Sequence, residues 1–376
     1  MDIKDYIYSH KHDMICMLRD LVEMDSASEN IEGINQLAKY IEKRFKEAGL
    51  SAYRERLENG GDIVICQHES SGPKTLILGH FDTALPMGSV KENPFCIKGD
   101  KAYGPGVYDM KAGIAATLYA IQALFENGVQ PNLLIIWNCD EETGSHFSRK
   151  TIAQLAQGAS RCFVMETGEK DGGIVTSRKG VGVFSIWTKG ISAHAGAAPE
   201  KGRSAIEEIC YKALAVQKLS DPAAGIFANV GVISGGTAPS IIPEKAAIEV
   251  DIRISKQEST ETLTERIRSI TENNIVADVR SGWSGEFHRL PMEKTVEAQE
   301  LFNTLLEQAK EMGVELHEAT SGGASDANLT SAMNIPTLCG MGPEGDHAHT
   351  NEEYLDLASL FVRTELLARF LRKLYL

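Results

Sequence analysis

The segment LILGHFDT, residues 76–83, predicts how the first half of this chain folds. Its apolar start is typical of a buried β-strand, and strand alternation puts the side chains of His80 and Asp82 on one side where that strand ends. A neutral imidazole can bind a metal ion, and a nearby carboxylate can hold the ring in the correct tautomer. A single His–x–Asp is more often an ordinary polar strand end, so a site requires further ligands elsewhere in the chain.

Length and charge limit the class of protein. A chain of 376 residues exceeds one typical domain, so we expect two domains or one domain with an insertion. The chain has 38 basic and 52 acidic residues, a net charge of −14, which argues against nonspecific binding to nucleic acid or to anionic membranes. The N-terminus has no apolar signal-peptide core, and no stretch is long enough to span a membrane. The seven cysteines are scattered without a C-x-x-C, as in a cytoplasmic protein with reduced thiols.

Strands and helices alternate in both end portions of the sequence. Apolar strand patterns at residues 75–79, 133–139 and 162–166 are separated by helical patterns. The first fifty residues are predicted to form two helices, and further helices are expected at 111–125, 296–312 and 357–375. This alternation predicts an α/β fold with a mostly parallel sheet.

The pattern changes after Gly180. Alternating strands are expected at residues 180–190, 229–234 and 246–254, together with amphipathic helices at 204–219 and 260–273. We therefore expect one domain built from residues 1–180 and 287–376, interrupted by a separate α+β domain of residues 181–286.

Five positions carry side chains that could bind metal ions. They are His80, Asp109 in GPGVYDMKAG, Glu142 of the Glu141–Glu142 pair in NCDEETGS, Glu166 in VMETGE and His349 in GDHAHTNEEY. Nitrogen and oxygen ligands of this kind suit zinc, and several of them follow apolar strands, where an α/β sheet usually places its site.

Each position also has an ordinary alternative. Asp109 is most simply the N-cap of the following helix, and Glu141 and Glu142 are most simply a solvated acidic turn. His349 could be a surface histidine, and His347 competes with it. The order and context of all five together favour a metal site.

The series of motifs from HFDT through GPGVYDMKAG, CDEETGS, METG and HAG to HTNEEY resembles the di-zinc metallopeptidase family of aminoacylase, succinyl-diaminopimelate desuccinylase and carboxypeptidase G. The similarity covers nearly the whole chain and is greatest to the glutamate carboxypeptidases of the carboxypeptidase G type. It implies a zinc-exopeptidase-like catalytic domain and an inserted lid and dimerisation domain.

The resemblance also implies a role for each residue. His80 and Glu166 would bind one zinc ion, while Glu142 and His349 would bind the other. Asp109 would bridge the two ions, and the peptide bond after it would be cis.

Two acidic residues would assist the metal ligands. Asp82 would orient His80, and Glu141 would be the general base that takes a proton from a metal-bridging water and returns it to the leaving amine. Co²⁺ or Mn²⁺ could replace Zn²⁺, because an oxygen-rich ligand set does not fix the metal.

The inserted block and the loop SGGASDAN would supply the remaining site residues. His194 would stabilise the oxyanion in the partner subunit's site, and Arg253 would pair with a substrate carboxylate. Gly322 and Gly323 would line the substrate pocket. Ordinary alternatives are a loop histidine, a solvent-facing strand arginine and a plain turn.

One position departs from the family pattern. The segment GGTAPSIIP has Ser240 where relatives usually carry asparagine. Serine has no amide donor, so the oxyanion contact from this position and a close match to glutamate-specific relatives are both in doubt.

These implications define the expected function. The chain would be a cytoplasmic, homodimeric, two-zinc amidohydrolase that releases a C-terminal amino acid, with glutamate as the leading candidate, from a short peptide or an N-acyl amino acid. A dipeptidase or tripeptidase and an N-acyl amino acid deacylase are the alternatives in the same class. A non-hydrolytic, metal-dependent binding relative is disfavoured because Glu141 and all five candidate ligands are present.

Overall fold

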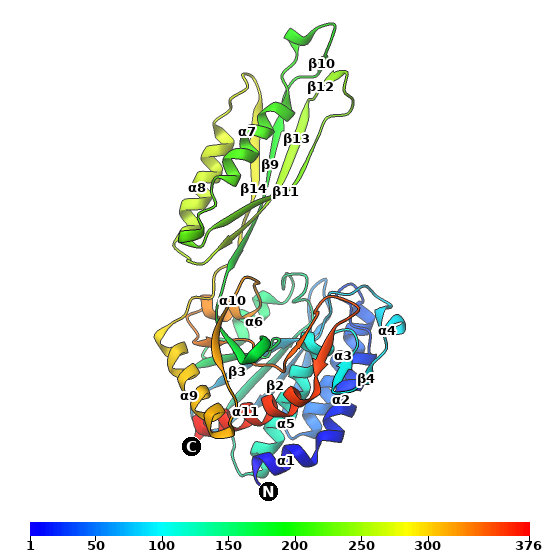
Figure 1. Cartoon of the computed structure of the whole chain (residues 1–376), viewed down its shortest axis with the longest axis vertical. Coiled ribbons are helices and arrows are strands. Elements are labelled where there is room, and N and C mark those ends of the chain that lie inside the picture. Colours follow the sequence, from blue (N-terminus) through cyan, green and yellow to red (C-terminus); the bar gives the residue numbers. More distant parts are fainter. The chain divides into compact units, whose positions relative to one another are not determined.

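Figure 1 shows the computed structural model, which describes residues 1–376 except for the side chain of Lys170. The chain forms two compact units. The first contains residues 1–177, 294–320 and 325–376, and the second contains residues 178–293 and 321–324. These bounds differ by a few residues from those expected for the inserted block. That the two units are domains with separate roles stays a prediction.

The first unit begins with three helices rather than the expected two, because the chain breaks at His10. These helices are α1 (Ile3–Ser9), α2 (Lys11–Glu23) and α3 (Ile31–Glu47). Helix α3 is capped by Asn30, whose side chain accepts a hydrogen bond from the Gly33 N–H. Its apolar face is buried and packs on strands β1 and β2 of the central sheet.

The central sheet of the first unit has six strands in the order β1-β2-β6-β3-β7-β16. They are β1 (Ser51–Arg56), β2 (Asp62–His68), β6 (Leu133–Asn138), β3 (Thr75–His80), β7 (Arg161–Val164) and β16 (Thr337–Leu338). Strands β6, β3, β7 and β16 are mutually parallel, while β1 and β2 run antiparallel at one edge. Every residue of β3 and β6 is buried. The prediction of a mostly parallel sheet is confirmed.

Helices surround this sheet in Figure 1. They include α4 (Ser89–Glu92), α5 (Ala112–Glu126), α6 (Arg149–Leu155), α9 (Val296–Met312), α10 (Ala327–Ala332) and α11 (Leu357–Tyr375). Helix α5 has 12 buried residues among its 15, and it packs against α11, which in turn packs against α9. The predicted bounds of α9 and α11 are confirmed.

Two smaller sheets complete the first unit. One has the order β17-β18-β5-β4, with β17 (Gly345–Asp346), β18 (Tyr354–Asp356), β5 (Lys101–Tyr103) and β4 (Cys96–Lys98). The other pairs β8 (Gly173–Arg178) with β15 (His317–Ser321). The first of these sheets joins the segment around residue 350 to the chain that leads into Asp109.

The second unit has a four-stranded antiparallel sheet in the order β11-β13-β9-β14. Its strands are β9 (Gly180–Lys189), β11 (Phe227–Gly235), β13 (Lys245–Ile254) and β14 (Arg280–Arg289). One face packs on α7 (Ala205–Gln217) and α8 (Ser259–Glu272) around a core that includes Phe184. Strand β14 was not predicted, because its glycines interrupt the alternation; its Trp283 and Phe287 pack on Phe184.

Short elements connect these strands and helices. A short antiparallel pair joins β10 (Ala193–His194) to β12 (Ile241–Ile242) in the second unit. One-turn helices are η1 (Val107–Lys111), η2 (Lys170–Gly172), η3 (Pro199–Lys201) and η4 (Pro222–Ala224). None of the described helices combines the length and the apolarity that crossing a membrane requires.

Candidate metal centre

Three strands of the central sheet end beside one another. Strand β3 ends at His80, β6 ends just before the Glu141–Glu142 pair, and β7 ends two residues before Glu166. Because β3 pairs in parallel with both β6 and β7, the carboxyl ends of all three lie at the same edge. The sheet therefore brings together side chains that are far apart in the sequence.

Asp109 lies in the irregular turn η1 before helix α5. It does not cap α5, because the N-cap position is Lys111 and no side chain caps that end. The peptide bond between Asp109 and Met110 is cis, as the family resemblance implies.

The two oxygens of Asp109 face different histidines. Its Oδ1 lies 3.3 Å from His80 Nε2, and its Oδ2 lies 3.2 Å from His349 Nε2. The carboxylate is only 13% exposed. One side chain therefore connects two histidines that are 269 positions apart (349 − 80).

The ring of His80 is buried and held on one side by Asp82. Its Nδ1 lies 3.1 Å from the carbonyl oxygen of Asp82 and 3.4 Å from Asp82 Oδ1. Because both neighbours are acceptors, Nδ1 carries a proton, and Nε2 is the nitrogen that faces Asp109 and Glu166, whose Oε1 is 3.8 Å away; in the neutral ring Nε2 has the free lone pair. This is the tautomer that binds a metal through Nε2.

Asp82 also holds the loop that carries Glu141 and Glu142. Its two carboxylate oxygens accept the backbone N–H groups of these residues, each at 3.1 Å. A third hydrogen bond comes from the hydroxyl of Ser28 at 2.7 Å. Asp82 is fully buried, and these bonds satisfy a carboxylate that burial would otherwise destabilise.

His349 pairs with Glu142 on the other side of Asp109. The distance from His349 Nε2 to Glu142 Oε2 is 3.2 Å. His347 faces elsewhere, with its ring 5.9 Å from that of Tyr354. The geometry thus favours His349 over His347 as a member of the cluster.

Glu141 lies on the side of His80 and Glu166. One potential ligand atom from each of these three residues lies within 4.8 Å of the others, and the same holds for His80, Asp109 and Glu142. These five acidic and histidine side chains thus form two overlapping groups that share His80.

The electrostatics of the cluster favour positive charge within it. Burial opposes protonation of His80, but the carboxylates of Glu166, Asp109 and Asp82 outweigh it and raise the pKa of the imidazole. Hydrogen bonds to Asp109 and Glu142 raise the pKa of His349 to about 11. Burial raises the pKa of Glu142, and the two histidines lower that of Asp109 despite its burial.

The residues present fit two divalent cations. Asp109 Oδ1 and Glu142 Oε1 are buried without a hydrogen-bond partner among the described residues. The acidic side chains of the cluster carry four negative charges when ionised, and two divalent ions would balance them. These side chains are those of Asp109, Glu141, Glu142 and Glu166. Buried charge of one sign is costly unless it is paired, and nitrogen and oxygen donors are suitable ligands for zinc.

Two further carboxylates support the cluster, and the sequence motifs did not predict their roles. Glu353 accepts hydrogen bonds from the backbone next to Asp109. Asp326 is buried and accepts hydrogen bonds from Asn138 and Ser145, at the two ends of the loop that contains Glu141. Their place in the motifs HTNEEY and SGGASDAN was the only signal in the sequence, because local patterns do not reveal such long-range contacts.

In the second unit, His194 and Ser240 lie close together. The N–H of Ala195 donates to the carbonyl oxygen of Ser240 at 2.9 Å, next to the β10–β12 pair. His194 Nδ1 accepts the N–H groups of Gly196 and Ala197, both at 3.1 Å. In the neutral ring the proton is therefore on Nε2, so His194 is an exposed hydrogen-bond donor.

Arg253 and the two predicted glycines also lie in the second unit. The guanidinium of Arg253 forms a two-point ion pair with Asp251, at 2.7 and 3.0 Å. The carbonyl oxygen of Gly323 accepts a hydrogen bond from Arg178, and the space around the Cα of Gly322 is open. These residues lie in a different unit from the His80 cluster, so their roles stay predictions.

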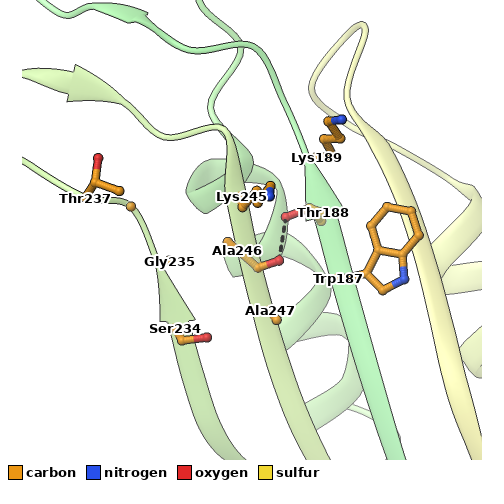
Figure 2. Close-up of a pocket in the computed structure, with 10 residues that line it drawn as sticks. Trp187, Thr188, Lys189, Ser234, Gly235, Thr237, Lys245, Ala246 and Ala247 are labelled. Carbon is orange, nitrogen blue, oxygen red and sulfur yellow. Dashed lines mark hydrogen bonds between the residues drawn. The ribbon is translucent and has the colours of Figure 1, made fainter.

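A pocket of about 510 Å³ in the second unit is not part of the cluster (Figure 2). It lies where strands β9, β11 and β13 meet, and its walls include Trp187, Lys189 and Lys245. No histidine or carboxylate lines it, so the pocket has no imidazole or carboxylate ligand for a metal ion.

Comparison with known proteins identifies the family of this chain. The model of peptidase family M20/M25/M40 matches residues 76–373. The chain belongs to this family. It is therefore a metal-dependent hydrolase of the M20 peptidase type, and the predicted resemblance is confirmed.

Relatives of this M20 protein include several peptidases. Carboxypeptidase G2 from Pseudomonas sp. (strain RS-16) is 28% identical over 375 residues, which cover 96% of this chain and 89% of the relative. A succinyl-diaminopimelate desuccinylase from Ehrlichia ruminantium (strain Gardel) is 25% identical, covering 85% of this chain and 88% of the relative.

Solved structures establish the fold. Aminopeptidase PepT from Bacillus cereus superposes with a TM-score of 0.83 at 22% identity, covering 97% of this chain and 98% of the other. The YXEP protein from Bacillus subtilis, described as a dinuclear metal-binding peptidase, gives a TM-score of 0.73 at 19% identity, covering 98% and 99%. The predicted α/β fold with an M20 architecture is thus confirmed.

Proposed function

We propose that this M20 hydrolase is a two-zinc amidohydrolase that releases a C-terminal amino acid from a short peptide or an N-acyl amino acid. The observation that carries the proposal is the position of Asp109 between His80 and His349, at 3.3 and 3.2 Å. A carboxylate with one oxygen toward each histidine is what a bridging ligand requires.

His80 and Glu166 would hold one ion, His349 and Glu142 would hold the other, and Asp109 would contact both. When bound, such ions act as Lewis acids that acidify water and polarise a carbonyl oxygen. Co²⁺ and Mn²⁺ accept the same ligands, so the metal is part of the test.

Glu141 would serve as the general base and then as the general acid. Its backbone is fixed by Asp82, while its neighbour Glu142 faces His349. The contact with His349 supports a ligand role for Glu142, and Glu141 would accept a proton from the attacking water. Glu141 would then donate the proton to the leaving amine nitrogen.

The second unit would supply substrate contacts. His194 presents its Nε2–H to solvent and would donate a hydrogen bond to the oxyanion. Arg253 now pairs with Asp251, and it would form an ion pair with the free carboxylate of the substrate in place of that contact. Glutamate is the leading candidate for the released residue because the sequence motifs resemble those of the glutamate carboxypeptidases of the carboxypeptidase G type, and carboxypeptidase G2 is among the relatives. Ser240 in place of asparagine removes an amide donor beside His194, so oxyanion binding would depend more heavily on His194.

A homodimer formed through the second unit is part of the proposal. Ile206, Cys210 and Leu214 form an exposed row on helix α7, and strand β11 is a sheet edge with Val232 and Ile233 more than half exposed. An unpaired edge strand beside an exposed apolar row favours pairing with an identical copy. We infer a cytoplasmic location from the seven cysteines, all described and none in a disulfide.

The test is amine release by zinc-loaded protein from a panel of short peptides and N-acyl amino acids. Release of the C-terminal residue supports the carboxypeptidase, and the best substrate shows whether that residue is glutamate. Preference for a dipeptide or tripeptide with a free amino terminus would favour a peptidase of that class. Preference for simple acyl groups would favour a deacylase. Metal binding without turnover on any panel member would contradict the proposed function.

A further inference from the structure

We propose that Glu353 is a positioning residue that holds the backbone around Asp109, so that the Asp109 carboxylate can contact both proposed metal ions. The inference rests on the proposed two-metal function and extends it to a residue that is not itself a ligand. Glu353 lies four positions after His349 in the motif HTNEEY.

Three backbone N–H groups converge on the carboxylate of Glu353. Its Oε1 accepts from Tyr108 at 2.9 Å and from Asp109 at 3.0 Å, and its Oε2 accepts from Gly106 at 3.0 Å. The side chain is only 2% exposed. Both oxygens are therefore occupied by the turn itself, and Glu353 acts on the centre through Asp109.

The turn is shaped to surround an anion. Gly106 has φ +71° and ψ 12°, a left-handed conformation, and the N–H groups of Gly106, Tyr108 and Asp109 all reach the same carboxylate, while the N–H of Val107 donates to the carbonyl oxygen of Gly104. A Cβ at this position would lie 2.6 Å from Thr83 Cγ2, which excludes larger residues. A carboxylate matches several converging donors better than a neutral acceptor, because charged acceptors make stronger hydrogen bonds.

The contact joins two segments that both carry proposed ligands. His349 and Glu353 lie on the connection between β17 and β18, while Asp109 lies in η1. These segments therefore meet twice, once through Glu353 and the backbone, and once through His349 Nε2 and Asp109 Oδ2.

Nearby groups brace the same turn. The hydroxyl of Tyr108 donates to the carbonyl oxygen of Gly168 at 2.9 Å, which ties the turn to the loop after Glu166. The buried ammonium of Lys111 donates to the carbonyl oxygen of Met24 at 3.1 Å. The backbone before and after Asp109 is thus fixed, and the Glu353 carboxylate is the acceptor at its centre.

The decisive experiment is titration of metal-free protein with Co²⁺, followed by calorimetry and by the visible absorption of the bound ion. Glu353→Gln replaces one oxygen with an NH₂ group, which faces N–H donors and cannot accept from them. Because Asp109 faces both histidines, we expect both binding steps to weaken by about 10- to 100-fold, with an altered Co²⁺ spectrum.

Glu352→Gln is the matched control. It makes the same chemical change at the preceding residue, whose side chain is exposed. We expect two ions to bind with wild-type affinity and spectrum. Urea unfolding of both metal-free variants shows whether the fold is retained.

Glu353→Asp keeps the negative charge but shortens the side chain, so it should reach fewer of the three N–H groups and bind metal with intermediate affinity. It also provides the test if Glu353→Gln does not fold. Wild-type affinity in either folded variant, or weakening of only one binding step, would overturn the inference. If the wild type itself binds fewer than two ions, the proposed function fails and this inference fails with it.

Discussion

The carboxylate of Asp82 accepts the backbone N–H of Glu142 at 3.1 Å, across 60 positions of sequence. The same carboxylate accepts the N–H of Glu141 and lies beside His80 Nδ1. One buried side chain thus sets the tautomer of one proposed ligand and the backbone position of another. Its role is wider than orientation of His80, which was all that the motif HFDT implied.

Replacement of this carboxylate should therefore affect both metals. Asp82→Asn leaves a single acceptor oxygen where two N–H groups and a hydroxyl now converge. We expect metal affinity to fall by about 10- to 100-fold, as measured by equilibrium titration with Zn²⁺. Ser28→Ala, which removes only the hydroxyl partner, should have a much smaller effect. Equal losses in the two variants would contradict the importance of the backbone contacts.

Loss of the proposed general base should separate turnover from metal content. Glu141→Ala should retain two ions per chain, while kcat falls by about 10²- to 10⁴-fold. Metal analysis of the purified variant and amine-release kinetics measure the two quantities. Glu352→Ala, at an exposed position, should leave both unchanged. If Glu141→Ala loses metal together with activity, Glu141 is a ligand and its proposed role is wrong.

The two neighbouring histidines of the motif GDHAH should behave differently. His349→Ala removes a nitrogen that lies 3.2 Å from both Asp109 and Glu142, so one of the two ions should be lost. His347→Ala removes a ring that packs near Tyr354 and should retain both ions. Metal analysis after dialysis distinguishes them. The reverse result would transfer the proposed ligand to His347.

His194 should affect turnover without affecting metal binding, because it lies in the other compact unit and on an exposed loop. His194→Ala should lower kcat by about 10²- to 10³-fold, the usual effect of removing one oxyanion donor. Metal content and the unfolding midpoint in urea should remain those of the wild type. Unchanged kcat would remove His194 from the proposed site.

The proposed dimer can be tested at Leu214, which is 62% exposed on helix α7. Leu214→Glu should produce a monomer in light scattering, because a carboxylate would be buried against an apolar surface. Thr262→Glu adds the same charge at an exposed position of α8 and should remain dimeric. If His194 acts across subunits, the monomer should also lose turnover while it keeps its metal. A dimeric Leu214→Glu would place any interface elsewhere.

The sequence by itself determined the main elements of the fold. Helices α9 and α11 begin and end where the apolar period predicts, and strands β3 and β6 follow from short, continuous apolar runs. These features depend on the spacing of apolar residues along the chain, which is visible in the sequence itself. The metal-ligand candidates were also visible, because each belongs to a recognisable motif.

The tertiary structure decided how those candidates meet. No local pattern relates Asp109 to both His80 and His349, or Glu353 to the turn before Asp109. The parallel register of β3, β6 and β7 aligns the strand ends that carry ligands. The small sheet that contains β5 and β18 brings the segment of His349 and Glu353 to the segment of Asp109. Strand β14 likewise became a strand by pairing with β9, although its glycines hide the alternation. Contacts between distant segments depend on the packing of the whole chain, whereas helices and strands depend mainly on neighbouring residues.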